Sequence, residues 1–325
     1  MTMSAAPRSA DILLLVRLVL RRGGVYVAIL ALLVVSGLIS RPTVTLSHLL
    51  EVAQAASFLG IAALGETLVL LTGGLDLSTG GTITLASIVA ASAMNGQNSR
   101  TLPMIAACLV LGLSVGLVNG VLVTRARINP FIATLGTNAI LFGAGLIYSG
   151  GAPRGAISAA FHAGVDSSLA GVPVTVLLCL LLLALVTIGL KTTLWGRYLF
   201  VTGANPRAAF LSGIDVGVVV TLAYVVCGLT AALAGLLLTG YVGSAALGLG
   251  NDYILNTVAA VIVGGTAFEG GRGSVAGSVA GAFFLTLLYS VTNMAHVPIA
   301  GEDVLQGVII AGGVALYARG TTPVR

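Results

Sequence analysis

Long apolar segments follow one another through nearly the whole sequence, and short polar or glycine-containing breaks separate them. A helix that crosses a bilayer needs about 20 consecutive, mostly apolar residues. Only 8% of the residues are charged, which is too few to cover the surface of a water-soluble protein of this length. The sequence therefore predicts an all-α integral membrane protein. The candidate spans are residues 24–40, 46–71, 80–94, 102–124, 130–147, 172–190, 215–240, 254–267, 274–294 and 304–318.

Three of these candidate spans, 80–94, 254–267 and 304–318, are short for a bilayer. Short hydrophobic segments beside glycine-rich breaks are typical of the discontinuous helices of transporters. We therefore expect about ten transmembrane helices, some of them short or discontinuous. They form a single transmembrane domain over residues 1–325, of which residues 1–23 are a cytoplasmic N-terminal lead.

The basic residues lie between the apolar segments, and their distribution orients the chain in the membrane. With the N-terminus in the cytoplasm, only Arg41, Arg100 and Arg154 of the 15 Lys and Arg residues fall outside. The positive-inside rule favours this orientation over its inverse. Both chain termini are therefore predicted to be cytoplasmic.

The cysteines, Cys108, Cys179 and Cys227, all lie inside apolar segments. No Cys or His residue accompanies them at the spacing of a metal site. We therefore expect them to be packing residues, and we expect no metal centre.

Two carboxylates interrupt the glycine-containing stretch from Leu64 to Gly81. A carboxylate near the middle of a membrane costs about 2.5–3.5 kcal/mol on insertion scales, so it usually faces a cavity or a partner group. Glu66 and Asp76 are therefore candidates for lining a solute path. Asp76 or Ser78 alternatively caps the next helix, because such side chains accept hydrogen bonds from the first backbone N–H groups of a helix.

A second break, from Val263 to Ser274, resembles the first in its glycine spacing and in the position of Glu269. Both breaks fall on the cytoplasmic side of the predicted topology. Glycine-rich segments match one another easily, so this similarity does not establish an internal repeat.

The longest cytoplasmic connection, residues 191–214, is basic, and it is longer than the loop that joining two spans requires. Asn205 and Pro206 precede a helix-compatible run from Arg207 to Leu211, which is typical of a helix start. This run either docks on a soluble partner or is a solvated interfacial segment. The sequence has no Walker A motif, so any ATP that powers transport must be hydrolysed on another chain. The protein itself is then no enzyme.

Four segments, taken in order, resemble the membrane permeases of ribose-type (monosaccharide) ABC importers, within the superfamily that includes branched-chain amino acid permeases. They are Leu71–Gly80 (LTGGLDLSTG), Asn129–Thr137 (NPFIATLGT), Trp195–Ile214 (WGRYLFVTGANPRAAFLSGI) and Val258–Gly273 (VAAVIVGGTAFEGGRG). One departure lies just before the last segment, where many members carry an acidic residue and this chain has Leu255 and Asn256. Asp252 is a candidate substitute.

The resemblance implies a permease of the bacterial cytoplasmic (inner) membrane that moves its solute by alternating access. It implies cytoplasmic ATPase subunits that bind ATP and Mg, a periplasmic or lipid-anchored sugar-binding protein, and a second permease copy or a paired permease. It also implies that connection 191–214 is the ATPase coupling element. The matching candidates are Arg197, Gly203, Asn205, Pro206, Arg207, Ala208, Ala209 and Gly213.

A neutral sugar needs hydroxyl and amide partners, and polar side chains inside spans either face the path or bridge helices. The candidate pathway residues are Glu66, Thr72, Asp76, Ser78, Asn119, Thr134, Thr137 and Asn138. One alternative hypothesis is a cation-coupled secondary transporter in which Glu66 and Asp76 carry protons. Another is a permease of the same superfamily for an amino acid, a nucleoside or a signalling molecule.

Overall fold

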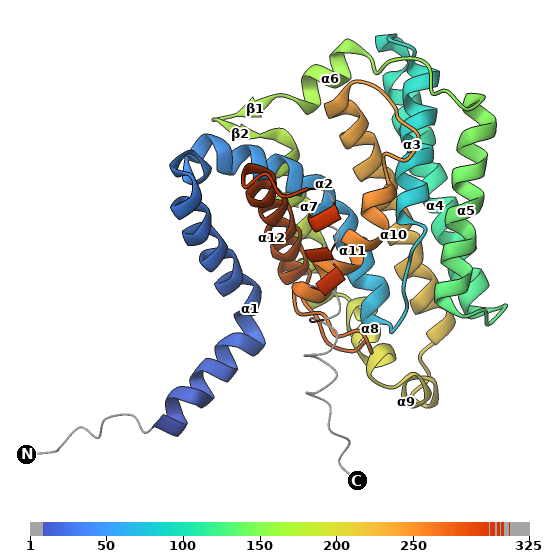
Figure 1. Ribbon diagram of the computed structural model, residues 1–325. Helices are drawn as coiled ribbons and strands as arrows, with labels where there is room; N and C mark the ends of the chain where they lie inside the picture. Colours follow the sequence, from blue (N-terminus) through green and yellow to red (C-terminus); the bar gives the residue numbers. More distant parts are fainter. Residues whose placement is uncertain (1–8, 299, 303, 306, 309–311, 313–325) are drawn as a thin grey trace, which may run out of the picture.

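The computed structural model describes residues 9–298, 300–302, 304, 305, 307, 308 and 312. The chain folds into a helical bundle with one two-stranded hairpin at its surface (Figure 1). The first half contains α1 (Ser9–Ile39), η1 (Arg41–Val44), α2 (Leu46–Leu71), α3 (Thr79–Met94), η2 (Asn98–Arg100), α4 (Thr101–Thr124) and α5 (Pro130–Ser149). The second half contains α6 (Ala159–Val165), β1 (Ser168–Leu169), β2 (Val172–Pro173), α7 (Val174–Thr192), α8 (Leu194–Ala204), α9 (Pro206–Leu211), α10 (Val216–Val242), α11 (Asn251–Val263) and α12 (Val275–Met294).

The all-α membrane fold predicted from the sequence is confirmed. Among the described residues, 6 helices are long and apolar enough to cross a membrane, and 24–39, 79–94 and 251–263 are shorter apolar helices. The predicted lead 1–23 is helical from Ser9 and continues directly into the first span, whereas residues 1–8 lie outside the described part. The tenth predicted span, 304–318, lies almost entirely outside the described residues.

Helix α2 is the centre of the bundle. It packs against α7, α10, α11 and α12, and 89% of its most apolar window is buried inside the protein. By contrast, only 17% of the corresponding window of α7 is buried. Thus α7 presents apolar residues to lipid, while α2 is enclosed by other helices and places its polar side chains inside the protein.

The spaced glycines of α4 allow it to pack very closely on α10. A Cβ at Gly116 would collide with the backbone carbonyl of Tyr224, and one at Gly120 would lie 2.8 Å from Cα of Thr221. Small residues at such positions let two helix backbones approach, and the resulting van der Waals packing is one source of helix association inside a membrane. All three cysteines are buried.

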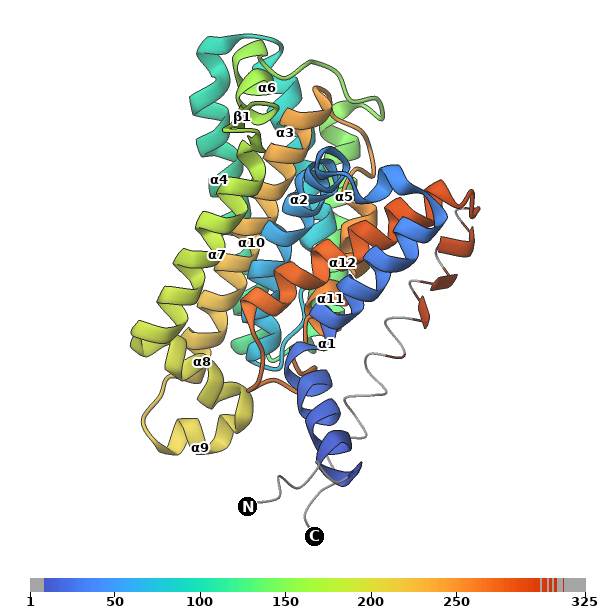
Figure 2. The ribbon, with the colours of Figure 1, turned by 90° about the vertical axis from the view of Figure 1, so that its left-hand side faces the viewer.

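The two ends of the bundle carry different elements. Figures 1 and 2 both place α9 and the first turns of α1 at one end, and α6 at the other. We call the end with α9 the inner end, following the positive-inside assignment. Arg207, in α9, and Arg272, in the second glycine-rich break, are both exposed.

The predicted cytoplasmic connection 191–214 is mostly helical. The short helix predicted over Arg207–Leu211 is present as α9, and Pro206 is its first residue. Asn205 caps it, because its side-chain Oδ1 accepts a hydrogen bond from the backbone N–H of Ala208 at 3.0 Å. The sequence did not predict α8, which begins after an extended residue, Thr193, at the end of α7 and precedes α9.

Candidate functional site

The break between α2 and α3 folds back into the bundle instead of leaving it. The backbone N–H of Asp76 donates a hydrogen bond to Oε1 of Glu66 at 3.1 Å, so the break returns alongside the helix that it has just left. Glu66 and Asp76 are both fully buried. The two carboxylates singled out in the sequence are therefore neighbours in space.

A network of hydrogen bonds surrounds Asp76. Its Oδ1 accepts from the backbone N–H of Ser78 at 2.9 Å and from the Ser78 hydroxyl at 2.6 Å. The side-chain amide of Asn119, in α4, donates hydrogen bonds to Oδ1 of Asp76 at 3.3 Å and to the hydroxyl of Ser78 at 2.8 Å. Thr137 of α5 completes the chain by donating to Oδ1 of Asn119 at 2.7 Å. Five of the predicted pathway residues thus form one buried polar cluster.

Helix α5 holds the break from its other side. The Thr134 hydroxyl accepts a hydrogen bond from the backbone N–H of Leu77 at 3.0 Å. One helical turn later, Oδ1 of Asn138 accepts from the backbone N–H of Gly81 at 2.7 Å. Gly81 is in the first turn of α3, where backbone N–H groups have no partner within the helix. Asn138 therefore caps α3 from a different helix.

This arrangement corrects one expectation from the sequence. Asp76 does not cap α3, because its bonds go to Ser78 in the turn before the helix, a pattern typical of Asp in turns. Ser78 occupies the N-cap position but makes no capping bond with its side chain. The cap comes from Asn138, which is 57 residues away in the sequence.

Thr72 is the one predicted pathway residue that stands apart from these contacts. Its hydroxyl donates to the carbonyl of Val69 within its own helix, at 2.7 Å. It therefore ends α2 locally, and within the described residues its side chain forms no hydrogen bond with the cluster around Asp76.

Two residues of α10, Tyr224 and Cys227, also hydrogen-bond to this part of the chain, and neither contact was predicted from the sequence. The hydroxyl of Tyr224 donates to the carbonyl of Leu75 in the break at 3.2 Å. Sγ of Cys227, which we expected only to pack, donates to Oε2 of Glu66 at 3.7 Å. The signal for Tyr224 was present, because a tyrosine hydroxyl buried in an apolar span needs a hydrogen-bond partner.

The cluster has unusual electrostatics. Within the described residues, no Lys or Arg forms a salt bridge with Glu66 or Asp76. The hydrogen-bond donors around the two carboxyl groups offset the cost of burying them. Among the described residues, Oδ2 of Asp76 has no hydrogen-bond partner at ordinary distance and angle, and the Cys227 thiol interacts with the same carboxyl group.

The predicted coupling residues gather at the inner end around α8 and α9. Arg197, Arg207 and Ala208 are exposed, whereas Gly203 and Ala209 are buried. Gly213 follows α9 with a positive φ of 81° and ends the helix-containing connection. Next to the predicted residues, Phe210 and Leu211 are 70% and 78% exposed. These two side chains form an exposed apolar surface at the end of α9.

The second break begins where α11 ends. Gly264 and Gly265 terminate α11 at Val263, four residues earlier than the predicted span 254–267. At the other end, α11 begins at Asn251 and places Asp252 on the surface in its first turn. Asn256 is buried and accepts a hydrogen bond from the Tyr289 hydroxyl at 3.2 Å.

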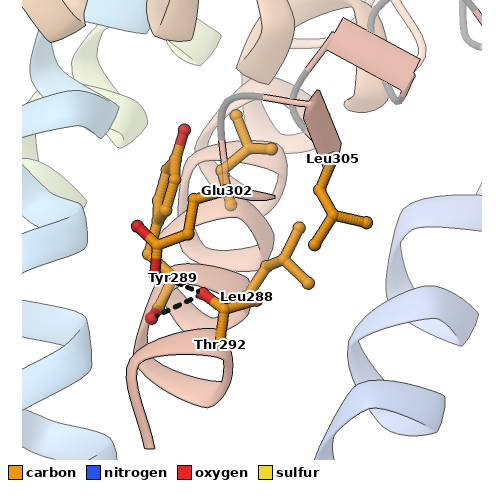
Figure 3. Close-up of a pocket in the computed structure, with 6 residues that line it drawn as sticks. Leu288, Tyr289, Thr292, Glu302 and Leu305 are labelled. Atoms are coloured by element: carbon orange, nitrogen blue, oxygen red, sulfur yellow. Dashed lines mark hydrogen bonds between the residues drawn. The ribbon is translucent and has the colours of Figure 1, made fainter. Parts of the chain in front are cut away.

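Neither of two surface pockets contains a predicted pathway residue. A pocket of about 10 Å³ lies beside α12 and includes Glu302, which accepts a hydrogen bond from Thr292 at 2.8 Å (Figure 3). That volume suits about one water molecule. A larger pocket of about 380 Å³ lies near the outer end and includes Phe161, Thr175 and Leu178.

Comparison with known proteins accounts for most of the chain. Residues 48–312 match the family described as the branched-chain amino acid transport system / permease component. The ribose import permease protein RbsC of Escherichia coli (strain K12) is 34% identical over 291 residues, which is 87% of this chain and 89% of that protein. The galactose/methyl galactoside import permease protein MglC of the same strain is 32% identical over 324 residues, covering 92% and 96% of the two chains.

A third relative has a different cargo in its name. The autoinducer 2 import system permease protein LsrD of Escherichia coli O9:H4 (strain HS) is 33% identical over 300 residues, 89% of this chain and 90% of that protein. No solved structure matches the chain significantly.

These matches confirm the resemblance that the four segments carry and the prediction of a non-catalytic membrane subunit. They also imply, in general terms, ATPase and binding-protein partners. The chain belongs to the branched-chain amino acid transport system / permease component family, and it is the multi-pass membrane permease of an ABC importer similar to the ribose and galactose import permeases.

Proposed function

We propose that this permease imports a monosaccharide, such as a pentose or a hexose, by alternating access. The observation that carries the proposal is the similarity, over most of both chains, to permeases named for ribose and for galactose. The relative named for autoinducer 2 is almost as similar, so a sugar-like signalling molecule is the second candidate cargo. In either case the solute crosses the membrane without covalent change.

The ATPase docks on α9 at the inner end. Asn205 and Pro206 fix the start of this helix, and its Phe210 and Leu211 present an exposed apolar surface beside the charge of Arg207. Lipid does not cover this surface in the predicted topology, because it lies on the cytoplasmic side of the bundle. ATP and Mg bind to that partner, and a sugar-binding protein delivers the solute at the outer end to a pair of permease subunits.

The solute path runs along the break between α2 and α3. The predicted pathway residues supply hydroxyl, amide and carboxyl groups inside the membrane, which suit the hydroxyl groups of a sugar. In the conformation described here five of these residues form the cluster around Asp76, and most of the predicted pathway residues are buried. In an open conformation the same groups exchange their mutual hydrogen bonds for bonds to the solute.

Reconstituted transport tests this function. The permease, its ATPase and its binding protein are placed in proteoliposomes, and uptake of labelled ribose, galactose and autoinducer 2 is measured with ATP. Amino acids are added as competitors. We expect ATP-dependent uptake of one monosaccharide that amino acids do not inhibit.

Two results contradict the proposal in different ways. Uptake driven by an imposed proton gradient without the ATPase establishes the cation-coupled alternative. ATP-dependent uptake of autoinducer 2 or an amino acid, with no sugar uptake, retains the importer and replaces its cargo.

A further inference from the structure

Three glycine-containing segments that are distant in the sequence meet at one point near the inner end of the bundle. They are the end of α2 with Gly73, the end of α8 with Gly203, and the turn 269–271 in the second break. Each comes from a different one of the family-like segments identified in the sequence. We call this meeting point the glycine junction.

Backbone atoms touch directly at the glycine junction. The N–H of Gly271 donates a hydrogen bond to the carbonyl of Leu71, the last residue of α2, at 2.9 Å. A Cβ on Gly203 would collide with that same carbonyl and lie 2.5 Å from the nitrogen of Gly271. A Cβ on Gly270 would lie 2.7 Å from the nitrogen of Gly73. No side chain larger than hydrogen fits between the three segments.

The glycine junction adjoins the proposed ATPase-docking helix. A Cβ on Gly271 would lie 2.7 Å from Cα of Ala204, the last residue of α8, and the next residue, Asn205, is the cap of α9. On its other side the junction leads through residues 72–78 to the cluster around Asp76. The end of α8, which leads into the docking helix, is therefore in direct backbone contact with both breaks.

We infer that the glycine junction transmits movement of α9 to both breaks, with Gly203 as the positioning residue. The inference rests on the proposed docking of the ATPase at α9. Side chains adjust their rotamers when neighbouring elements shift, whereas backbones in direct contact move together. When the ATPase displaces α9, the Leu71 carbonyl and the turn at Gly271 therefore move by nearly the same distance. Packed elements of this kind switch between discrete arrangements instead of deforming gradually.

Pure packing is the competing explanation. Close glycines let helices approach in any membrane protein, and the contact of α4 with α10 in this chain is of that sort. The two explanations differ in a measurable quantity. A packing role affects only stability, whereas a transmitting role affects how strongly ATP hydrolysis responds to the sugar-loaded binding protein.

The test uses the whole importer with Gly203→Ala in the permease. Gly189→Ala is the matched control, because a Cβ at Gly189, in α7, meets nothing within 4 Å. The readouts are copurification of the ATPase, the ratio of ATP hydrolysis with and without loaded binding protein, and sugar moved per ATP. We expect Gly203→Ala to keep the ATPase bound while the ratio falls by about fivefold or more, the usual size of coupling between sites. The control should match the wild type.

A second variant adds no atoms and so avoids the risk that the first fails to fold. Ala204→Gly loosens the backbone between the glycine junction and α9, and Ala184→Gly on the exposed face of α7 is its control. We expect a smaller fall of the same ratio with the ATPase still bound. A wild-type ratio in both junction variants overturns the inference, as does loss of ATPase binding in both. An ATPase that binds normally when α9 is altered overturns the proposed docking instead.

Discussion

Oδ1 of Asn138 accepts a hydrogen bond from the backbone N–H of Gly81 at 2.7 Å, so that one membrane helix caps the N-terminus of another. The cap ties α5 to the first turn of α3. The hydrogen bond from the backbone N–H of Leu77 to Thr134 is also made to α5, so both bonds hold the end of the break against that helix.

Removing this cap should destabilise the permease. In Asn138→Ala the backbone N–H of Gly81 loses its partner, and loss of an N-cap costs about 0.5–2 kcal/mol. We expect a lower apparent melting temperature in detergent. Ser114→Ala is the control, because Ser114 is exposed and, within the described part of the chain, its hydroxyl bonds only to Val110 in its own helix. Equal melting temperatures for the two variants contradict the role of Asn138.

Gly112 should tolerate no side chain. A Cβ at this position in α4 would collide with the carbonyl of Gly228 in α10, and overpacking of this kind costs about 1–3 kcal/mol. We expect Gly112→Ala to lower the apparent melting temperature and the yield of monodisperse protein. Gly136→Ala, where a Cβ meets nothing within 4 Å, should instead leave stability unchanged or raise it. If Gly112→Ala and Gly136→Ala change the apparent melting temperature equally, the close contact of Gly112 with α10 is contradicted.

A charge on α9 should separate the permease from its ATPase. Ala208 is exposed on this helix, next to the apolar pair Phe210 and Leu211. An arginine there places an unpaired charge in the docking surface. We expect Ala208→Arg, or deletion of Asn205–Leu211, to abolish copurification of the ATPase while the bundle still inserts. Ala152→Arg in an exposed outer loop is the charge-matched control, and normal copurification with Ala208→Arg refutes docking at α9.

Glu66→Gln should change transport without changing assembly. The glutamine keeps an oxygen for the backbone N–H of Asp76, but it places an amide group where Oε2 now faces Cys227. We expect the rate of sugar uptake to fall about tenfold, which corresponds to about 1.4 kcal/mol. ATPase copurification should be normal. Glu51→Gln is the control, because the Glu51 side chain is 76% exposed. Unchanged uptake kinetics in Glu66→Gln assign Glu66 a structural role.

The helices of this chain follow closely from its sequence. The predicted span 46–71 coincides with α2, because polar residues and glycines mark both ends of the apolar run. The start of α11 was placed three residues too late, because Asn251 and Asp252 are polar and a hydropathy criterion excludes them. Helix α8 was missed for a similar reason, since its sequence alternates apolar residues with Gly, Arg and Thr.

The partners within the candidate site do not follow from the sequence. Polar residues inside apolar spans identified the members Glu66, Asp76 and Asn119, but which of them touch depends on how the helices are rotated. Asn119 reaches Asp76 across 43 residues of sequence, and Cys227 reaches Glu66 across 161. A cysteine in an apolar run has the same sequence signature whether it packs against leucine or against a carboxyl group.

The burial of the three native cysteines has a practical consequence for following the transport cycle. Thiol reagents react with exposed thiolates, and all three cysteines are buried in the described conformation. A single cysteine introduced at an exposed position such as Ala152 therefore gives a specific attachment point for a fluorophore or a spin label. Distances between labelled helices can then be recorded in a protein that retains its native cysteines, including the one beside Glu66.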